Sequence, residues 1–406
     1  MAVIIPAPTW RRDLACLSLV MVVIYLLTAN HGPLSSSTRY YESSREMAEL
    51  GDWVVPHLAY APYVEKPPLV YWLGASARLL GDHPLITSLP SLLASLVTMV
   101  ATYLFGSWWR GRVVGLAAAG LLIGSCFAAV MSGVLTTDPL LAATLSVAFL
   151  LWWRWDIGER TQQRWLYGFY LAVAIGWLAK GPIALILPGA VIAVHALLRG
   201  GVVAIATTLW SMRPWWGVVI ITVINLPWSL ALLARDPRML EFFYVRINFD
   251  AFFKGNYNHP GPWWYYGQVL CGSLAPFTVI ALPVLLQVLW DPLRSLRWTR
   301  TGPSQTETTE PTALYLTSIV LGAMLFLSIS SAKLGTYLMP ITPAIFLLLA
   351  NALQHWQVPP RWATWLVVAQ TAIVLVLVGC APLVLIAVHH ALEAGTNLVI
   401  AGVTFA

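Results

Sequence analysis

Residues 35–81 read SSSTRYYESSREMAELGDWVVPHLAYAPYVEKPPLVYWLGASARLLG and form a polar, aromatic segment between two long apolar runs. Charged residues make up only 10% of the 406-residue chain, yet this segment holds several of each sign. The flanking runs, residues 14–29 and 84–107, are close to the length that a helix needs to cross a bilayer. We therefore expect the segment to be a loop outside the membrane, held between two spans.

The composition of the whole chain indicates a membrane protein. Hydrophobic residues make up 59% of it, whereas soluble domains are about 45–50% apolar. Only helices and closed barrels satisfy their own backbone in lipid, and the alternation typical of a barrel is absent. We predict an all-α, polytopic transmembrane helical bundle in a single domain, residues 1–406. About eleven spans are expected by window length, at 14–29, 84–107, 113–135, 139–153, 165–179, 183–198, 214–233, 263–290, 312–331, 336–353 and 362–388, with 201–211 at the interface.

The arginines set the expected orientation. With the amino terminus inside, the inner loops hold thirteen of them: Arg11, Arg12, Arg110, Arg112, Arg154, Arg160, Arg164, Arg199, Arg213, Arg294, Arg297, Arg300 and Arg361. This assignment puts two large loops outside, residues 30–83 and 234–262, together with all four lysines, Lys66, Lys180, Lys254 and Lys333. Cations on the outer face suggest a bound anion there. The alternative is that they pair with nearby acids and snorkel at the interface.

The first outer loop is expected to contain two interfacial helices. Thr38 caps a helix that continues to Leu50 and ends at Gly51. Prolines then keep the chain extended until a second helix begins at Leu69. The tyrosines and tryptophans of this loop either edge a functional shelf or form an ordinary interfacial belt.

This loop resembles the first outer loop of GT-C type membrane glycosyltransferases, the group that contains protein O-mannosyltransferases and the aminoarabinose transferase of lipid A. Further similar motifs follow in the same order over nearly the whole chain: TTDPLLA (136–142), LAKGPIALILPG (178–189), NLPW (225–228), GPWWYY (261–266) and SSAKLGTYLMPITP (330–343). The resemblance implies a GT-C fold in the inner (plasma) membrane. It also implies transfer of a sugar from a polyprenyl phosphate to a lipid, glycan or protein acceptor outside the cytoplasm.

The resemblance also assigns candidate substrate-binding residues. Arg39 and Lys66 match positions that contact the donor phosphate, and Tyr337, beside Lys333, matches another contact on the phosphate side. Lys180 lies in an AKGP turn, where it is either a ligand or a helix-end anchor. Arg246 lies in the second outer loop, where Asn248 replaces a histidine that is frequent in relatives.

The sequence departs from the family at the expected catalytic base. Relatives carry an Asp-Glu pair where this chain has Ser36 and Ser37, and a serine is no base near neutral pH without activation. Asp138 and Glu65 are the remaining candidates for the base. We assign no metal ligand and no cofactor, and leave open a divalent cation. The four cysteines lie far apart, without zinc or disulfide spacing, and are expected to pack as small apolar side chains.

Two other functions compete with active transfer. An inactive family member would bind lipid phosphate or serve as a partner subunit, as the two serines suggest. A transporter is less favoured, because no internal repeat or paired broken helices are visible. No phosphate-cradling glycine loop is present, and orientation explains the basic residues better than nucleic-acid binding does.

Overall fold

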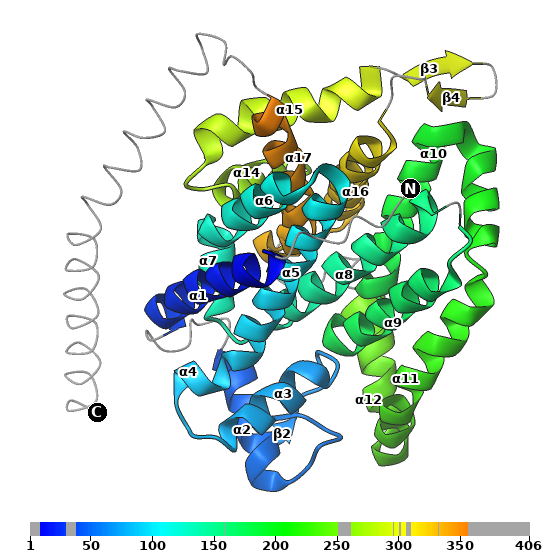
Figure 1. The fold of residues 1–406 in the computed structure, drawn as a ribbon. Helices are drawn as coiled ribbons and strands as arrows, with labels where there is room; N and C mark the ends of the chain where they lie inside the picture. The colour runs from blue at the N-terminus through cyan, green and yellow to red at the C-terminus, as the bar shows by residue number, and fades with distance from the viewer. Residues whose placement is uncertain are drawn as a thin grey trace.

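The structure is a computed structural model that describes residues 9–29, 38–158, 160–250, 261–294, 296–299, 302–305, 310–331 and 333–355. Within these ranges the chain is helical apart from loops and two short antiparallel hairpins, so the predicted all-α class is confirmed (Figure 1). The expected span 362–388, Lys254, and Ser36 and Ser37 lie outside the described residues.

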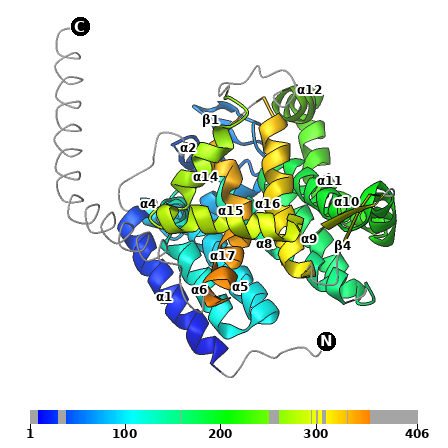
Figure 2. The same ribbon diagram turned by 90° about the horizontal axis from the view of Figure 1, so that it is seen from above.

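The first part of the bundle contains α1 (Trp10–Thr28), α4 (Pro84–Thr87), α5 (Leu89–Arg110), α6 (Arg112–Gly124), α7 (Cys126–Ser132), α8 (Thr137–Ile157), α9 (Gln163–Lys180), α10 (Ile183–Ser211) and α11 (Pro214–Arg235). The second part contains α12 (Pro237–Glu241), the π-helix η2 (Phe242–Asp250), α14 (Tyr265–Ser273), α15 (Thr278–Arg294), β3 (Leu296–Thr299), β4 (Gly302–Gln305), α16 (Pro311–Ile329), the 3₁₀ helix η3 (Gly335–Ile341) and α17 (Thr342–His355). Seen from above, α15 runs across α16 and α17, which it contacts (Figure 2).

Six helices of the described chain are long and apolar enough to cross a membrane, or seven if α6 and α7 form one broken span. This makes the protein a polytopic membrane protein, although the expected count of about eleven is not confirmed. The expected span 113–135 bends by 67° between α6 and α7, and the expected span 263–290 is divided between α14 and α15. Residues 201–211 continue α10 beyond a kink at Gly200 and Gly201.

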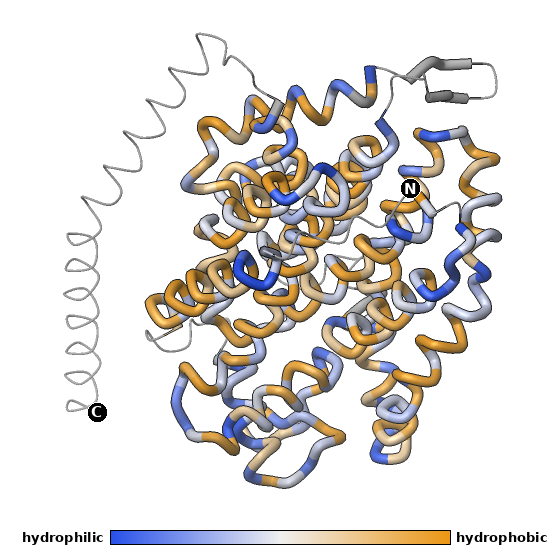
Figure 3. The backbone as a smooth tube through the Cα atoms, in the orientation of Figure 1, coloured by the Kyte–Doolittle hydropathy of each residue, from blue (hydrophilic) through white to orange (hydrophobic). Residues whose placement is uncertain are grey.

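The bundle core includes large side chains from α5, α8 and α16. Trp153 stacks on Phe105 with ring centroids 4.4 Å apart, and Trp152 stacks on Tyr315 at 4.9 Å. Hydrophobic residues line most of the helix length, while hydrophilic ones gather near helix ends and in the first loop (Figure 3). Cys16 and Cys126 are exposed on their helices, so the expectation that the cysteines pack inside is wrong for these two.

Both helices predicted for the first loop form. They are α2 (Thr38–Leu50) and α3 (Leu69–Arg78), and between them lies a proline-rich strap with the small hairpin of β1 (His57–Leu58) and β2 (Ala61–Pro62). After α2 ends, the Asp52 carboxylate accepts hydrogen bonds from the Val54 and Val55 amides and turns the chain. The two helices lie together at one end of the molecule, at the bottom of Figure 1.

Apolar contacts fix the loop to the bundle. Met47 of α2 and Tyr71 of α3 pack with Leu140 near the start of α8 and with Ala179 near the end of α9. On the other side of the loop, Val55 and Val64 of the strap pack against α11, whose Trp228 donates to the Val54 carbonyl at 2.9 Å. The loop is therefore a fixed platform beside the ends of α8 and α9.

The two loop helices approach each other closely at Gly74 of α3. A Cβ atom at this position would lie 2.4 Å from Ser44 Oγ and 3.0 Å from both Ser44 Cβ and Leu135 Cδ2. No side chain fits there without moving α2, because buried side chains are already close-packed.

We expect Gly74→Ala to lower thermal stability in detergent by about 1–3 kcal/mol, the range typical of overpacking. The matched control is Gly120→Ala in α6, where an added Cβ meets no atom within 4 Å. Alanine favours a helix over glycine by up to about 1 kcal/mol, so the control should be neutral or stabilising. Equal melting temperatures for the two variants would contradict the close contact between α2 and α3.

Candidate active site

Asp138 occupies the first turn of α8, beside the end of α9. Thr136 is the N-cap of the helix, and its hydroxyl accepts a hydrogen bond from the Asp138 amide and donates one to Asp138 Oδ2 at 3.0 Å. The carboxylate is thus held by its own helix cap. It also lies at the amino-terminal end of α8, where the helix dipole is positive.

Lys180 is the last residue of α9, and its ammonium group forms an ion pair with Asp138 Oδ1. Gly181, with φ of +83°, ends the helix here, a backbone conformation that glycine adopts without strain. Both side chains are buried, with exposed fractions of 8% for Lys180 and 9% for Asp138. The Lys180 ammonium also lies 4.2 Å from the centre of the Tyr337 ring. This contact brings η3 to the same place as α8 and α9.

The first loop adds a second, more exposed ion pair. Arg39 Nη1 of α2 donates to Glu65 Oε2 at 3.3 Å and to the Tyr63 hydroxyl at 2.9 Å. That hydroxyl donates in turn to Glu65 at 2.6 Å. Burial and the hydrogen bond to Glu65 raise the pKa of Tyr63, so this hydroxyl remains a donor at physiological pH. Arg39 itself is half exposed, which leaves donors on the open side of the loop.

Lys66 lies next to Glu65 and near both ion pairs. Desolvation lowers its pKa to about 8, the positive charge of Lys180 acts in the same direction, and Glu65 and Asp138 oppose them. Its ammonium group makes no hydrogen bond or ion pair with any residue that the structure describes. A partly buried lysine with no counter-ion is a favourable position for an anion.

The structure thus brings six predicted residues to one region: Arg39, Glu65, Lys66, Asp138, Lys180 and Tyr337. The buried ammonium group of Lys333 donates at 2.8 Å to the carbonyls of Ser328 and Ser330 at the end of α16. Arg246 is exposed on η2 and has no partner within the described chain. A ligand role for these two residues stays a prediction.

Two tyrosines of the site were missed by sequence analysis. Tyr63 joins Arg39 to Glu65, and Tyr40 of α2 is so close to Asp138 that this charge adds to burial in raising the pKa of Tyr40. Their sequence signal was masked by the many aromatics that an interfacial loop contains anyway. Among the described residues, no group of three His, Cys, Asp or Glu side chains could hold a metal ion. The structure does not describe the side chain of Asn248 or any part of His259.

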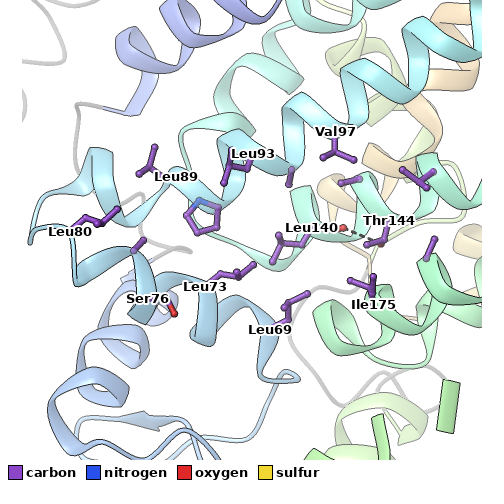
Figure 4. A pocket seen from close by; sticks show the side chains of 16 residues that line it. Leu69, Leu73, Ser76, Leu80, Leu89, Leu93, Val97, Leu140, Thr144 and Ile175 are labelled. Atoms are coloured by element: carbon purple, nitrogen blue, oxygen red, sulfur yellow. Dashed lines mark hydrogen bonds between the residues drawn. The ribbon is translucent and has the colours of Figure 1, made fainter. Parts of the chain in front are cut away.

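A large apolar cavity opens beside these charges. Its volume is about 610 Å³, and it lies between α3, α5, α8 and α9 (Figure 4). Leu69 of α3 and Leu140 of α8 line it, three residues after Lys66 and two residues after Asp138. Leu73, Leu93, Val97 and Ile175 continue the apolar lining.

Comparison with known proteins identifies the family of this chain. A family model described as dolichyl-phosphate-mannose-protein mannosyltransferase matches residues 15–243, more than half of the chain. The chain belongs to this family. The matched range includes the first loop, α8 and α9, and therefore every residue of the site except Tyr337.

Individual relatives extend the comparison. The undecaprenyl phosphate-alpha-4-amino-4-deoxy-L-arabinose arabinosyl transferase of Yersinia enterocolitica is 28% identical over 83% of this chain and 58% of its own length. A transferase of the same description from Pseudomonas fluorescens is 30% identical over 84% of this chain and 57% of its own length. The chain therefore spans less than three-fifths of these two relatives.

Solved structures show the same fold. ArnT from Cupriavidus metallidurans bound to undecaprenyl phosphate superposes with a TM-score of 0.75 at 23% identity, over 93% of this chain and 66% of that one. The archaeal oligosaccharyltransferase AglB from Archaeoglobus fulgidus superposes with a TM-score of 0.52 at 13% identity, over 91% of this chain and 55% of that one. The expected GT-C fold of this membrane family is confirmed.

A double-mutant cycle would measure the coupling in the Asp138–Lys180 pair. Lys180→Met leaves a buried carboxylate without its counter-ion and should destabilise the protein by about 3–5 kcal/mol. Adding Asp138→Asn removes the orphaned charge, so the double variant should be more stable than Lys180→Met alone. Chemical unfolding in detergent gives the comparison. A double variant that is less stable than Lys180→Met would contradict a buried, mutually dependent pair.

Proposed function

We propose that the protein is a glycosyltransferase that takes its sugar from a polyprenyl-phosphate donor and places the donor phosphate at Lys66. The observation that carries this proposal is the partly buried Lys66 ammonium without a partner among the described residues. The printed names of the relatives and the ligand in the Cupriavidus structure belong to those proteins, and they support the same donor class here.

The charges at the site favour an anionic ligand. Arg39 pairs with Glu65, and Lys180 pairs with Asp138, so each carboxylate already has a cation. Lys66 adds one positive charge beyond these pairs, and the exposed side of Arg39 offers further donors to the same ligand. The phosphodiester of the donor carries one negative charge, and the polyprenyl phosphate monoester that leaves carries between one and two near neutral pH.

The apolar cavity accounts for the lipid part of the donor. It begins within three residues of Lys66 and is lined almost entirely by apolar side chains of membrane-spanning helices and α3. An isoprenoid chain is apolar throughout and gains about 0.8 kcal/mol for each CH₂ group removed from water. An amphiphile with a phosphate head and a prenyl tail therefore matches the neighbouring charged and apolar regions better than a nucleotide sugar does.

The chemistry requires attack by an acceptor at the anomeric carbon of the sugar. A base takes the acceptor's proton, the new carbon–oxygen bond forms, and the bond to the donor phosphate breaks with both electrons going to the phosphate. Lys66 and Arg39 would stabilise the polyprenyl phosphate as it leaves. Removal of one preorganised donor of this kind typically costs on the order of 2–4 kcal/mol of transition-state stabilisation.

Asp138 and Glu65 remain the two candidates for the base. Asp138 is nearly inaccessible to solvent and bound to Lys180, whereas Glu65 is about a quarter exposed and bound to Arg39 and Tyr63. Each must exchange one of these partners for the acceptor before it can take a proton. Glu65 lies on the open side of the loop, so an acceptor reaches it without separating a buried ion pair, and we favour it.

The reaction is proposed to take place outside the cytoplasm, at the inner (plasma) membrane. The arginine-rich loops at the opposite helix ends support this orientation through the positive-inside rule. The acceptor is then a lipid, glycan or protein on the outer side. The use of a divalent cation stays open.

A binding protein without catalysis is the second candidate. It is favoured by the fact that both carboxylates of the site are engaged by cations, together with Ser36 and Ser37 in place of the acidic pair. Such a protein would keep the phosphate and tail sites. It would bind donor as tightly as an enzyme does and transfer nothing.

Donor binding should weaken as the pH rises through about 8. Only the ammonium form of Lys66 attracts phosphate, and its lowered pKa means that the proton is lost between pH 7 and 10, while a phosphate monoester with a second pKa near 6 stays fully charged. The dissociation constant of a short polyprenyl phosphate, measured in detergent, should rise by up to about tenfold for each pH unit above 8. Lys66→Arg should bind with a flat pH profile, since arginine stays protonated.

Variants that each remove one positive charge test the phosphate site at a single pH. Lys66→Ala and Arg39→Ala should each weaken polyprenyl phosphate binding about tenfold or more at pH 7. Arg238→Ala removes a cation that is 88% exposed and pairs only with Asp236 in the described chain, and it should leave binding unchanged. A wild-type affinity that is constant from pH 7 to 10, or equal losses in all three variants, would exclude Lys66 as the phosphate site.

Transfer from a polyprenyl-phosphate sugar separates the two candidate functions. If Glu65 is the base, Glu65→Gln should reduce single-turnover transfer by about 10²–10⁴-fold while donor binding stays within a few-fold of wild type. If Asp138 is the base, the same loss should appear in Asp138→Asn and not in Glu65→Gln. Wild-type protein that binds donor but transfers no sugar to any outer-face acceptor fraction would favour the binding protein.

A further inference from the structure

The opposite end of α8 carries a second group of cations. Arg154 lies in the last turn of this helix, sixteen residues after Asp138, which corresponds to about 24 Å along the axis. Around it lie Trp108 from the last turns of α5 and Arg164 and Trp165 from the start of α9. We refer to these four residues as the Arg154 cluster.

Arg154 is held between two indole rings. Its guanidinium carbon lies 5.2 Å from the centre of the Trp108 ring and 5.4 Å from the centre of the Trp165 ring. The two rings are 6.5 Å apart in an edge arrangement, so they form two walls around the guanidinium group. Arg164 stacks on Trp165 at 4.9 Å and brings a second positive charge to the same ring.

Two hydrogen-bond donors in this cluster are buried and have no acceptor. They are Nε of Arg154 and Nε1 of Trp108. Within the described chain, the Arg154 side chain makes no hydrogen bond or ion pair, and Arg164 donates only to the Gln162 side chain. Buried polar groups in proteins almost always have a partner, and the described chain supplies none for either of these donors.

Other cations at helix ends of this protein are neutralised. Arg160 and Arg199 share Asp156, Arg112 pairs with Asp13, and Arg110 lies 3.7 Å from Glu310. Stacking on tryptophan does not by itself exclude such a partner, because Arg160 stacks on Trp155 and still binds Asp156. The Arg154 cluster therefore differs from its surroundings in having two cations and no acid among the described residues.

We propose that the Arg154 cluster binds the phosphate of an anionic glycerophospholipid. A phosphodiester supplies the acceptor oxygens and the negative charge that Arg154, Arg164 and Trp108 lack. The cluster lies at the end of a membrane-spanning helix, and indole rings are enriched at the depth of lipid headgroups. Basic pockets between transmembrane helices bind anionic headgroups in this way. A lipid is favoured over free phosphate because its acyl chains lie beside the helices that carry the cluster.

The test compares lipids that differ only in headgroup charge. The full chain in neutral detergent is titrated with short-chain phosphatidylglycerol and with phosphatidylcholine, and binding is followed by native mass spectrometry and by the shift in thermal unfolding. Wild type should bind phosphatidylglycerol at least about tenfold more tightly than phosphatidylcholine. Arg154→Gln combined with Arg164→Gln should lose this preference. Arg294→Gln, which removes an exposed arginine at the end of α15, should keep it.

Two milder variants keep the test decisive if the double variant does not fold. Trp108→Phe removes the orphaned N–H group but keeps an aromatic ring, and Arg164→Gln changes an exposed side chain. Each should reduce the preference for phosphatidylglycerol severalfold without lowering the melting temperature of the lipid-free protein. A wild type that binds both lipids equally, or an equal loss in Arg294→Gln, would overturn the site. Displacement of phosphatidylglycerol by millimolar inorganic phosphate would overturn its assignment to a lipid.

Discussion

The ion pair between Asp138 and Lys180 is the constraint on which the arrangement of the site depends. Two antiparallel neighbours, α8 and α9, bring a helix start and a helix end together, and each terminus receives the charge that its dipole favours. Burying either charge without its partner would cost several kcal/mol. The pair therefore keeps the start of α8 next to the end of α9. Leu140 and Ala179, one turn or less from the two charges, then provide the apolar surface on which the first loop packs.

This packing explains why Lys66 is left without a partner. The loop is fixed through α2 and α3 on one side and through the strap and α11 on the other, and the EKPP turn lies between them. Pro67 and Pro68 restrict the backbone that follows Lys66, so the chain cannot relax the lysine toward solvent as a flexible loop would. The nearby carboxylates already form ion pairs with other cations, Glu65 with Arg39 and Asp138 with Lys180. A fixed, partly dehydrated cation is the result, which is the basis for proposing a phosphate site at Lys66.

Much of this fold could be predicted from the sequence, because the signals were local. The start of α3 at Leu69 and the end of α2 at Leu50 follow from prolines and a glycine next to amphipathic runs. The site was predicted through family resemblance, residue by residue. Asp138 and Lys180 are 42 residues apart in the sequence, and no local sequence pattern predicts that they pair. The contacts of Lys333 were not predictable either: its ammonium group donates to carbonyls at the end of α16, and a sequence does not display this backbone geometry.

The length of α8 between its charged ends has a consequence for the surrounding lipid. Asp138 and Arg154 are separated by about 24 Å along the helix, and the hydrocarbon core of a bilayer is about 30 Å thick. Tilting shortens the projected length and increases this mismatch, so the membrane must thin locally or the arginine must reach outward. A bilayer with a hydrocarbon core thicker than this span therefore costs free energy to accommodate, typically a fraction of a kcal/mol for each Å of mismatch.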